Sequence, residues 1–76
     1  MKELLEFVVT SLVDDASSVS VSVKEGEKFI DCFIKVNEND IGKVIGRNGK
    51  IANAIRTLAR ACAKKTNKKV NVKIEK

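Results

Sequence analysis

The sequence predicts an α+β fold, in which helices cover a three-stranded sheet to make a two-layer sandwich. Two hydrophobic patterns occur along the 76 residues: apolar residues three and four apart, typical of helices, and strict alternation, typical of strands. Their order is helix, strand, strand, short helix, helix, strand. A chain of this length forms one domain at most, so we expect residues 1–76 to be a single domain. The sheet would have one covered face and one open face.

The first half of the chain predicts a helix followed by a hairpin. Apolar residues recur three and four positions apart over residues 2–13, which is the spacing of one helix side. Alternation over residues 18–23 and 29–36 predicts two paired strands, with Gly26 in the turn and available for a positive φ. The apolar sides of these elements consist of Leu5, Val8, Val9, Leu12, Val19, Val21, Val23, Ile30, Cys32, Ile34 and Val36.

The second half predicts a short helix, a longer helix and a last strand. Asp40 is the expected N-cap of the short helix, which begins at Ile41 and is ended by glycines. The longer helix should run from Lys50 to about Lys65, and the last strand should cover residues 70–74. The predicted buried side of the longer helix consists of Ile51, Ile55, Leu58 and Cys62, with Ala52, Ala54, Ala59 and Ala61 allowing close packing.

Charge is divided unevenly between the two halves. Residues 1–40 carry four Lys against nine Asp or Glu, whereas residues 41–76 carry eleven Lys or Arg against Glu75 alone. A difference of this size indicates a polyanionic partner for the basic half. The alternative is a solvated basic face without a partner, because charge describes electrostatics and not fold.

The composition argues against a metalloprotein, a secreted protein, a membrane protein and an enzyme. The chain has no His, and its two cysteines, Cys32 and Cys62, lack zinc-ligand spacing and are expected in the core. The early acids Glu3 and Glu6 do not fit a signal peptide, and no apolar run approaches the roughly 18 residues of a membrane span. We therefore expect a cytoplasmic protein without a catalytic site, a cofactor or a small-molecule substrate.

Residues 41–51 contain the most informative motif, in which Gly46 and Gly49 bracket a turn between two helices. The spacing is wrong for a Walker phosphate loop, and Ile51 stands where that loop needs a hydroxyl. A dinucleotide-binding loop would have to open a βαβ unit, which this order of elements lacks. The structural alternative is a helix-to-helix turn in which glycine serves the backbone angles alone.

The same motif fits contact with a sugar–phosphate chain. Glycines let such a chain approach the main chain, and amides at the start of the following helix favour a phosphate. Arg47 at the tip can bond phosphate oxygens, Lys43 and Lys50 flank it, and Asn48 tolerates an unusual φ. The apolar residues on which bases can rest are Ile41, Val44 and Ile45. The full set of candidate binding residues is Ile41, Gly42, Lys43, Val44, Ile45, Gly46, Arg47, Asn48, Gly49 and Lys50.

A basic loop is expected after the long helix. It either guides a phosphate chain or merely keeps the surface soluble. Its lysines are Lys64, Lys65, Lys68 and Lys69. The aromatic residues are three Phe, so broad stacking platforms for bases are not expected. Two of them, Phe29 and Phe33, fall on the open side of the predicted sheet, where other segments cover them or a partner binds.

Residues 41–51 resemble the signature loop of KH domains, modules whose Gly-x-x-Gly loop clamps about four nucleotides. The order of elements looks like the type II arrangement, and the chain is similar to the bacterial single-domain KhpA (YlqC-type) RNA-binding family. The resemblance implies a mixed sheet, with the 29–36 strand central and parallel to the 70–74 strand. It also implies a single-stranded RNA groove bounded by the glycine loop, its adjoining helices, the central or last strand and the basic loop.

The resemblance further implies partners and a cellular role. Members of this family are expected to form homodimers and to pair with a larger RNA-binding protein, KhpB (also called Jag or EloR). That pairing implies links to RNA chaperoning, post-transcriptional control, cell elongation and cell-wall synthesis. Three functions remain open from the sequence: a single-stranded RNA binder, an assembly module with weak nucleic-acid affinity, and a ribosome-associated factor.

Overall fold

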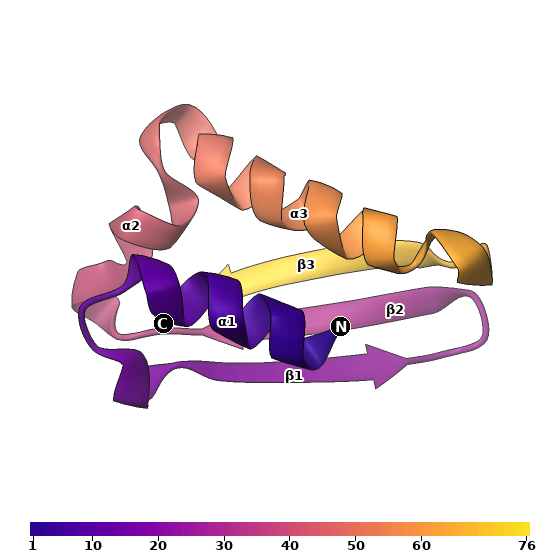
Figure 1. Ribbon diagram of the computed structural model, residues 1–76, viewed down its shortest axis with the longest axis horizontal. Coiled ribbons are helices and arrows are strands. Elements are labelled where there is room, and N and C mark those ends of the chain that lie inside the picture. Colours follow the sequence, from indigo (N-terminus) through magenta and orange to yellow (C-terminus); the bar gives the residue numbers. More distant parts are fainter.

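The computed structural model describes residues 1–76 and has the predicted order of elements (Figure 1). The helices are α1 (Lys2–Leu12), α2 (Ile41–Ile45) and α3 (Lys50–Cys62). The strands are β1 (Ser20–Glu25), β2 (Phe29–Lys35) and β3 (Lys69–Glu75). Short 3-10 turns join them at Ala16–Ser18, Glu38–Asp40, Arg47–Gly49 and Lys64–Thr66. None of the helices has both the length and the apolar composition that crossing a membrane requires.

The three strands form one mixed sheet in the order β1-β2-β3. β1 pairs with β2 in antiparallel fashion, with Val21 opposite Ile34, and β2 pairs with β3 in parallel, with Ile34 opposite Ile74. Figure 1 shows α1 and α3 lying across the same side of this sheet, so the other side is left without a covering helix. The mixed sheet and the single helical layer are both confirmed.

The core lies between the sheet and the helices. Even-numbered residues of β2 point into it, because side chains alternate along a strand. Leu5 and Val9 of α1 are fully buried against them. The predicted covered side of the second strand is confirmed, and its buried residues are Ile30, Cys32, Ile34 and Val36.

The predicted buried side of α3 is partly wrong. Leu58 is 40% exposed and Cys62 is also exposed, so Cys62 is not a core residue. The helix instead packs on the sheet through a narrow row of mostly small side chains, which lets its backbone lie close to the strands. That row consists of Ala52, Ile55, Ala59 and, just beyond the helix, Ala63. The larger apolar side chains are therefore displaced to one flank of the helix.

Several element boundaries also differ from the predictions. β1 begins at Ser20 and not at residue 18, and α3 ends at Cys62, where a 3-10 turn replaces its predicted last residues. Gly26 does not adopt a positive φ, and its N–H donates to the Phe29 carbonyl at 2.8 Å across the end of the hairpin. Hydrophobic periodicity identifies the elements but not the residues at which they end.

Candidate nucleic-acid interface

The turn between α2 and α3 contains three residues with a positive φ. Gly46 has φ 76° and ψ 173°, Asn48 has φ 59° and Gly49 has φ 76°. The Gly46 combination lies in a region that is essentially restricted to glycine, whereas Asn tolerates the left-handed region better than most residues. The predicted unusual φ of Asn48 is therefore confirmed. α3 begins at Lys50, directly after this turn.

The glycines of this segment serve different purposes. A Cβ on Gly46 would lie 2.6 Å from Cγ1 of Ile51, so packing within the protein requires glycine there. A Cβ on Gly42 or on Gly49 would meet nothing within 4 Å. The space beside Gly42 and Gly49 is open, and a ligand can approach the main chain at these two positions.

Most of the predicted binding residues lie at this surface, but one does not. Val44 is fully buried in the core, so the prediction that it offers bases a resting surface is wrong. Val44 is the one α2 residue turned fully into the core, which leaves Ile45 39% exposed and Ile41 partly exposed. The exposed polar members of the set are Lys43, Arg47, Asn48 and Lys50. Arg47 and Lys50 take part in none of the ion pairs of the structure.

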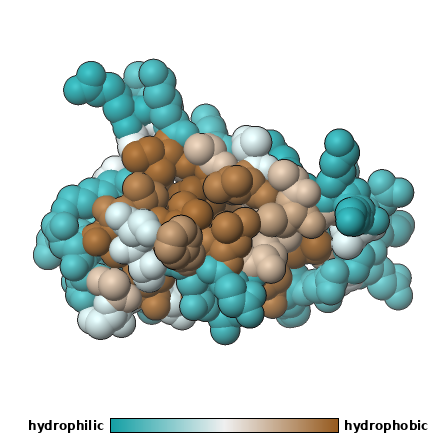
Figure 2. All heavy atoms as spheres, in the orientation of Figure 1, coloured by the Kyte–Doolittle hydropathy of each residue, from teal (hydrophilic) through white to brown (hydrophobic).

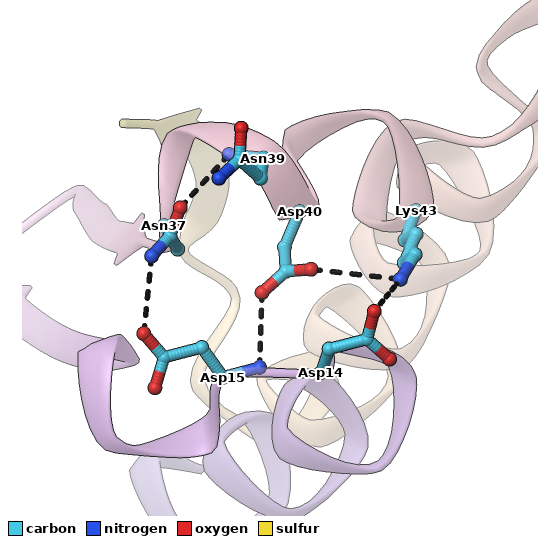
Figure 3. A network of polar contacts seen from close by, with 6 residues as sticks. All are labelled: Asp14, Asp15, Asn37, Asn39, Asp40 and Lys43. Atoms are coloured by element: carbon cyan, nitrogen blue, oxygen red, sulfur yellow. Dashed lines mark hydrogen bonds and ion pairs between the residues drawn. The ribbon is translucent and has the colours of Figure 1, made fainter.

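Lys43 differs from the other two cations of the loop because two carboxylates already hold it (Figure 3). Its Nζ forms an ion pair with the exposed Asp14 and lies 3.7 Å from Oδ1 of Asp40. The hydrogen bond to Asp14 raises the pKa of Lys43. A phosphate at this position would have to compete with Asp14, so Lys43 has less free positive charge than its place in the motif indicates.

Asp40 belongs to a network that sequence reasoning did not find. It stands at the N-terminus of α2 as predicted, but its side chain makes no capping bond, and it is buried. Its Oδ2 accepts from the Asp15 N–H at 3.1 Å. The Asp15 carboxylate in turn accepts from Ser17, Ser18 and Asn37, and these bonds, with that of Ser17 the largest, lower its pKa to about 2. The network ties the end of α1 to the start of α2 and so positions the loop (Figure 3).

The basic loop is not adjacent to the glycine turn. It follows α3, whose 13 residues separate the two by about 20 Å at 1.5 Å per residue, and Figure 1 shows them at opposite ends of that helix. Lys68 pairs with Glu25 at 3.1 Å, whereas Lys64, Lys65 and Lys69 form no ion pair. The residues lining a hollow of about 370 Å³ at the β3 edge are Arg60, Lys68, Lys69, Val70 and Asn71. A nucleotide strand that contacts both the glycine turn and the basic loop would therefore have to run along α3 and the β3 edge.

A helix–strand–strand–helix–helix–strand order, a mixed sheet and a Gly-x-x-Gly turn between two helices together define a KH domain. Residues 2–74 match the family described as KhpA/KhpB, KH domain. The chain belongs to this family, which consists of KH domains and not of enzymes.

Curated relatives agree with this family. The RNA-binding protein KhpA of Borreliella burgdorferi is 53% identical over 72 residues, covering 95% of this chain and 88% of that protein. The RNA-binding protein KhpA of Clostridium perfringens is 51% identical over 74 residues, covering 97% and 99%. A crystal structure of Era in complex with MgGDPNP and nucleotides 1506–1542 of 16S ribosomal RNA has a TM-score of 0.68 at 20% identity, covering 97% of this chain and 28% of that one. The last comparison supports the fold alone.

Proposed function

We propose that this protein binds single-stranded RNA, with the turn at residues 46–49 gripping the sugar–phosphate backbone. The observation that carries the proposal is the open main-chain surface at Gly42 and Gly49, next to two cations, Arg47 and Lys50, that no carboxylate neutralises. The relatives named RNA-binding protein KhpA support it. The proposal includes a cytoplasmic location and a role in post-transcriptional control or RNA chaperoning.

Different residues would contact the phosphates and the bases of the RNA. Phosphates would lie near Arg47 and Lys50, where the positive end of the α3 dipole adds to the charge of both side chains. Bases would rest on the exposed part of Ile45 and the partly exposed Ile41. Because neither contact reads a base edge, we expect modest discrimination among sequences.

A salt titration tests the proposal. With two to four phosphate contacts, a plot of log K against log salt concentration for a five-nucleotide oligouridine should slope by roughly −1.4 to −2.8, because each contact to a single strand contributes about −0.7. Fluorescence anisotropy of a labelled oligonucleotide measures the slope. Asp14→Asn removes one of the two carboxylates that hold Lys43 and leaves only the longer contact to Asp40, so the affinity should rise and the slope should steepen by up to about 0.7. A slope near zero would exclude binding through the phosphates.

A second candidate function is protein assembly, and exposed apolar side chains on the helical side favour it. Phe7 is 70% exposed, Leu58 is 40% exposed and Leu4 is 38% exposed. Figure 2 shows that apolar atoms gather across the face formed by α1 and α3, with hydrophilic side chains around them. A patch of this kind on a small protein is typical of an interaction surface. We infer that a second copy of the chain covers it, and that a KhpB-like partner uses the same surface.

Sedimentation equilibrium of Phe7→Ser measures this assembly. Phe7 lies outside the core, so the variant should keep its fold while the mass moves from that of a dimer toward that of a monomer. Ser22→Ala, an exposed change on the open face of the sheet and away from this patch, is the matched control and should sediment as the unsubstituted protein does. A monomeric mass for the unsubstituted protein at high micromolar concentration would contradict self-association. The link to cell elongation and cell-wall synthesis depends on the KhpB-like partner and is part of this second proposal.

A further inference from the structure

The open face of the sheet holds a hollow that neither proposed function uses. Its volume is about 420 Å³, and its lining residues are Asp31, Cys32, Phe33, Asn71 and Lys73. The odd-numbered residues among them point away from the helices, because the even-numbered residues of β2 fill the core. The hollow therefore lies on the side of the molecule opposite to the helical layer.

Four side chains form a compact group around this hollow. Phe33 of β2 lies directly beside Lys73 of β3, and Asp31 lies beside Asn71, because the two strands pair in that register. Strand spacing sets such a group at about 5 by 7 Å, which is the scale of one nucleobase. The Asn71 amide donates to Asp31 at 3.1 Å, which leaves one oxygen on each side chain free to accept from a base edge.

The charge of this face favours a polyanion. Four lysines point outward from it, against the two acids Asp31 and Glu75. None of the four lysines forms an ion pair in the structure. These lysines are Lys24, Lys35, Lys69 and Lys73. An aromatic ring beside an unpaired lysine is the combination that single-stranded nucleic acid uses for stacking and for its phosphates.

The hollow also adjoins the hollow at the β3 edge. Asn71 lines both hollows, and the one at the β3 edge is also lined by Arg60 of α3 and by Lys69. β3 is an edge strand, so no further strand blocks the way around it. The molecule measures 17 Å along its shortest axis, and Figure 1 looks down that axis onto the helical layer. A few nucleotides of an extended strand span this thickness.

We propose that single-stranded RNA longer than the clamped segment passes around the β3 edge and stacks one base on Phe33, with Lys73 binding its phosphate. This inference rests on the proposed RNA binding and extends it to a second contact site on the opposite face. The site takes a nucleobase of the same strand that the glycine turn holds. Binding therefore depends on RNA length as well as on the loop.

The test compares oligouridines of five and ten nucleotides. The ten-nucleotide probe should bind the unsubstituted protein more tightly than the five-nucleotide probe does. Phe33→Ala should weaken binding of the ten-nucleotide probe about tenfold, because one base loses the aromatic ring on which it stacks. The five-nucleotide probe should bind Phe33→Ala unchanged. Lys73→Gln, an exposed change that spares the fold, should show the same length-specific loss. Lys24→Gln removes an equal charge from the same face without touching the hollow, and it should lose far less affinity for the ten-nucleotide probe than Lys73→Gln does.

Ring proton shifts locate the contact independently. The chain contains three Phe and no Tyr or Trp, so the aromatic NMR spectrum is simple. The Phe33 ring should shift with the ten-nucleotide probe and not with the shorter one, while Phe7 should not shift. The second site would be excluded if all three variants gained as much affinity from the five- to the ten-nucleotide probe as the unsubstituted protein does. It would also be excluded if Lys24→Gln lost as much affinity for the ten-nucleotide probe as Lys73→Gln. If Phe33→Ala converted a dimer into a monomer, the open face of the sheet would bind a protein chain and not RNA. A failure of the loop contact is distinguishable from a failure of the second site. It would appear as an unchanged affinity for the five-nucleotide probe after Arg47 and Asn48 are replaced with Asp.

Discussion

Replacing Arg47 and Asn48 together with Asp should abolish RNA binding while the protein stays folded. Both side chains are exposed, and Asp tolerates the left-handed backbone that Asn48 adopts. The change removes the guanidinium at the tip and places two carboxylates where phosphates are expected. A hydrogen bond to a charged group contributes roughly 1.5–3 kcal/mol, and repulsion adds to its loss, so affinity for a five-nucleotide oligouridine should fall about 100-fold or more.

The control for this double variant changes the charge equally at a distant place. Lys28→Asp combined with Lys24→Gln also makes the protein three units more negative, but these residues lie at the β1–β2 hairpin, at the other end of the molecule from the turn (Figure 1). Fluorescence anisotropy should show a small loss for this variant, due to long-range charge alone. Equal losses in the two variants would mean that net charge, and not the loop, holds the RNA. Circular dichroism melting verifies that both remain folded.

Substituting Gly46 with Ala should destabilise the protein more than any other single change in the loop. The new Cβ would lie 2.6 Å from the Ile51 side chain, and the backbone at φ 76° and ψ 173° excludes residues with a Cβ. Overpacking costs roughly 1–3 kcal/mol and a strained backbone costs a similar amount. In a domain of this size each kcal/mol lowers the Tm by roughly 4–8 °C, so the Tm should fall by about 10 °C or more.

Gly42→Ala is the matched control for Gly46→Ala. A Cβ at Gly42 meets nothing within 4 Å, and the position is helical, where Ala is favoured over Gly by roughly 1 kcal/mol. Its Tm should equal or exceed that of the unsubstituted protein, yet its affinity for RNA should fall, because the methyl group occupies the space open to the strand. A Gly46→Ala protein that melts as the unsubstituted one does would show that the turn has a different conformation.

The sequence predicts the fold class because its two hydrophobic periods are cleanly separated. Alternation in β2 correctly identifies the buried residues, since a strand has only two sides. Phe29 and Phe33 occupy odd-numbered positions of the same strand, and the alternation likewise correctly places them on the open face. The resemblance to KH domains adds the mixed sheet, which requires β2 and β3 to pair in parallel although they are separated by two helices. Periodicity alone does not determine which strands become neighbours.

The errors in the site have a common physical origin in tertiary packing. α3 is rotated so that alanines face the sheet, which exposes Leu58 and Cys62 despite their helical spacing. Val44 occupies the inward side of a helix of five residues, too short for its buried side to be read from periodicity. The Asp14–Lys43 ion pair joins residues 29 apart in sequence, and no local pattern predicts it. By contrast, Gly46, Asn48 and Gly49 could be assigned, because backbone requirements are local.

The most direct test of the loop contact is an amide chemical-shift map of the ¹⁵N-labelled protein titrated with a five-nucleotide oligouridine. The largest shifts should fall at residues 42–51, with smaller ones near the exposed Arg60 of α3 and none at the exposed apolar residues of α1. Shifts concentrated on α1 and absent from residues 42–51 would contradict RNA binding through this turn.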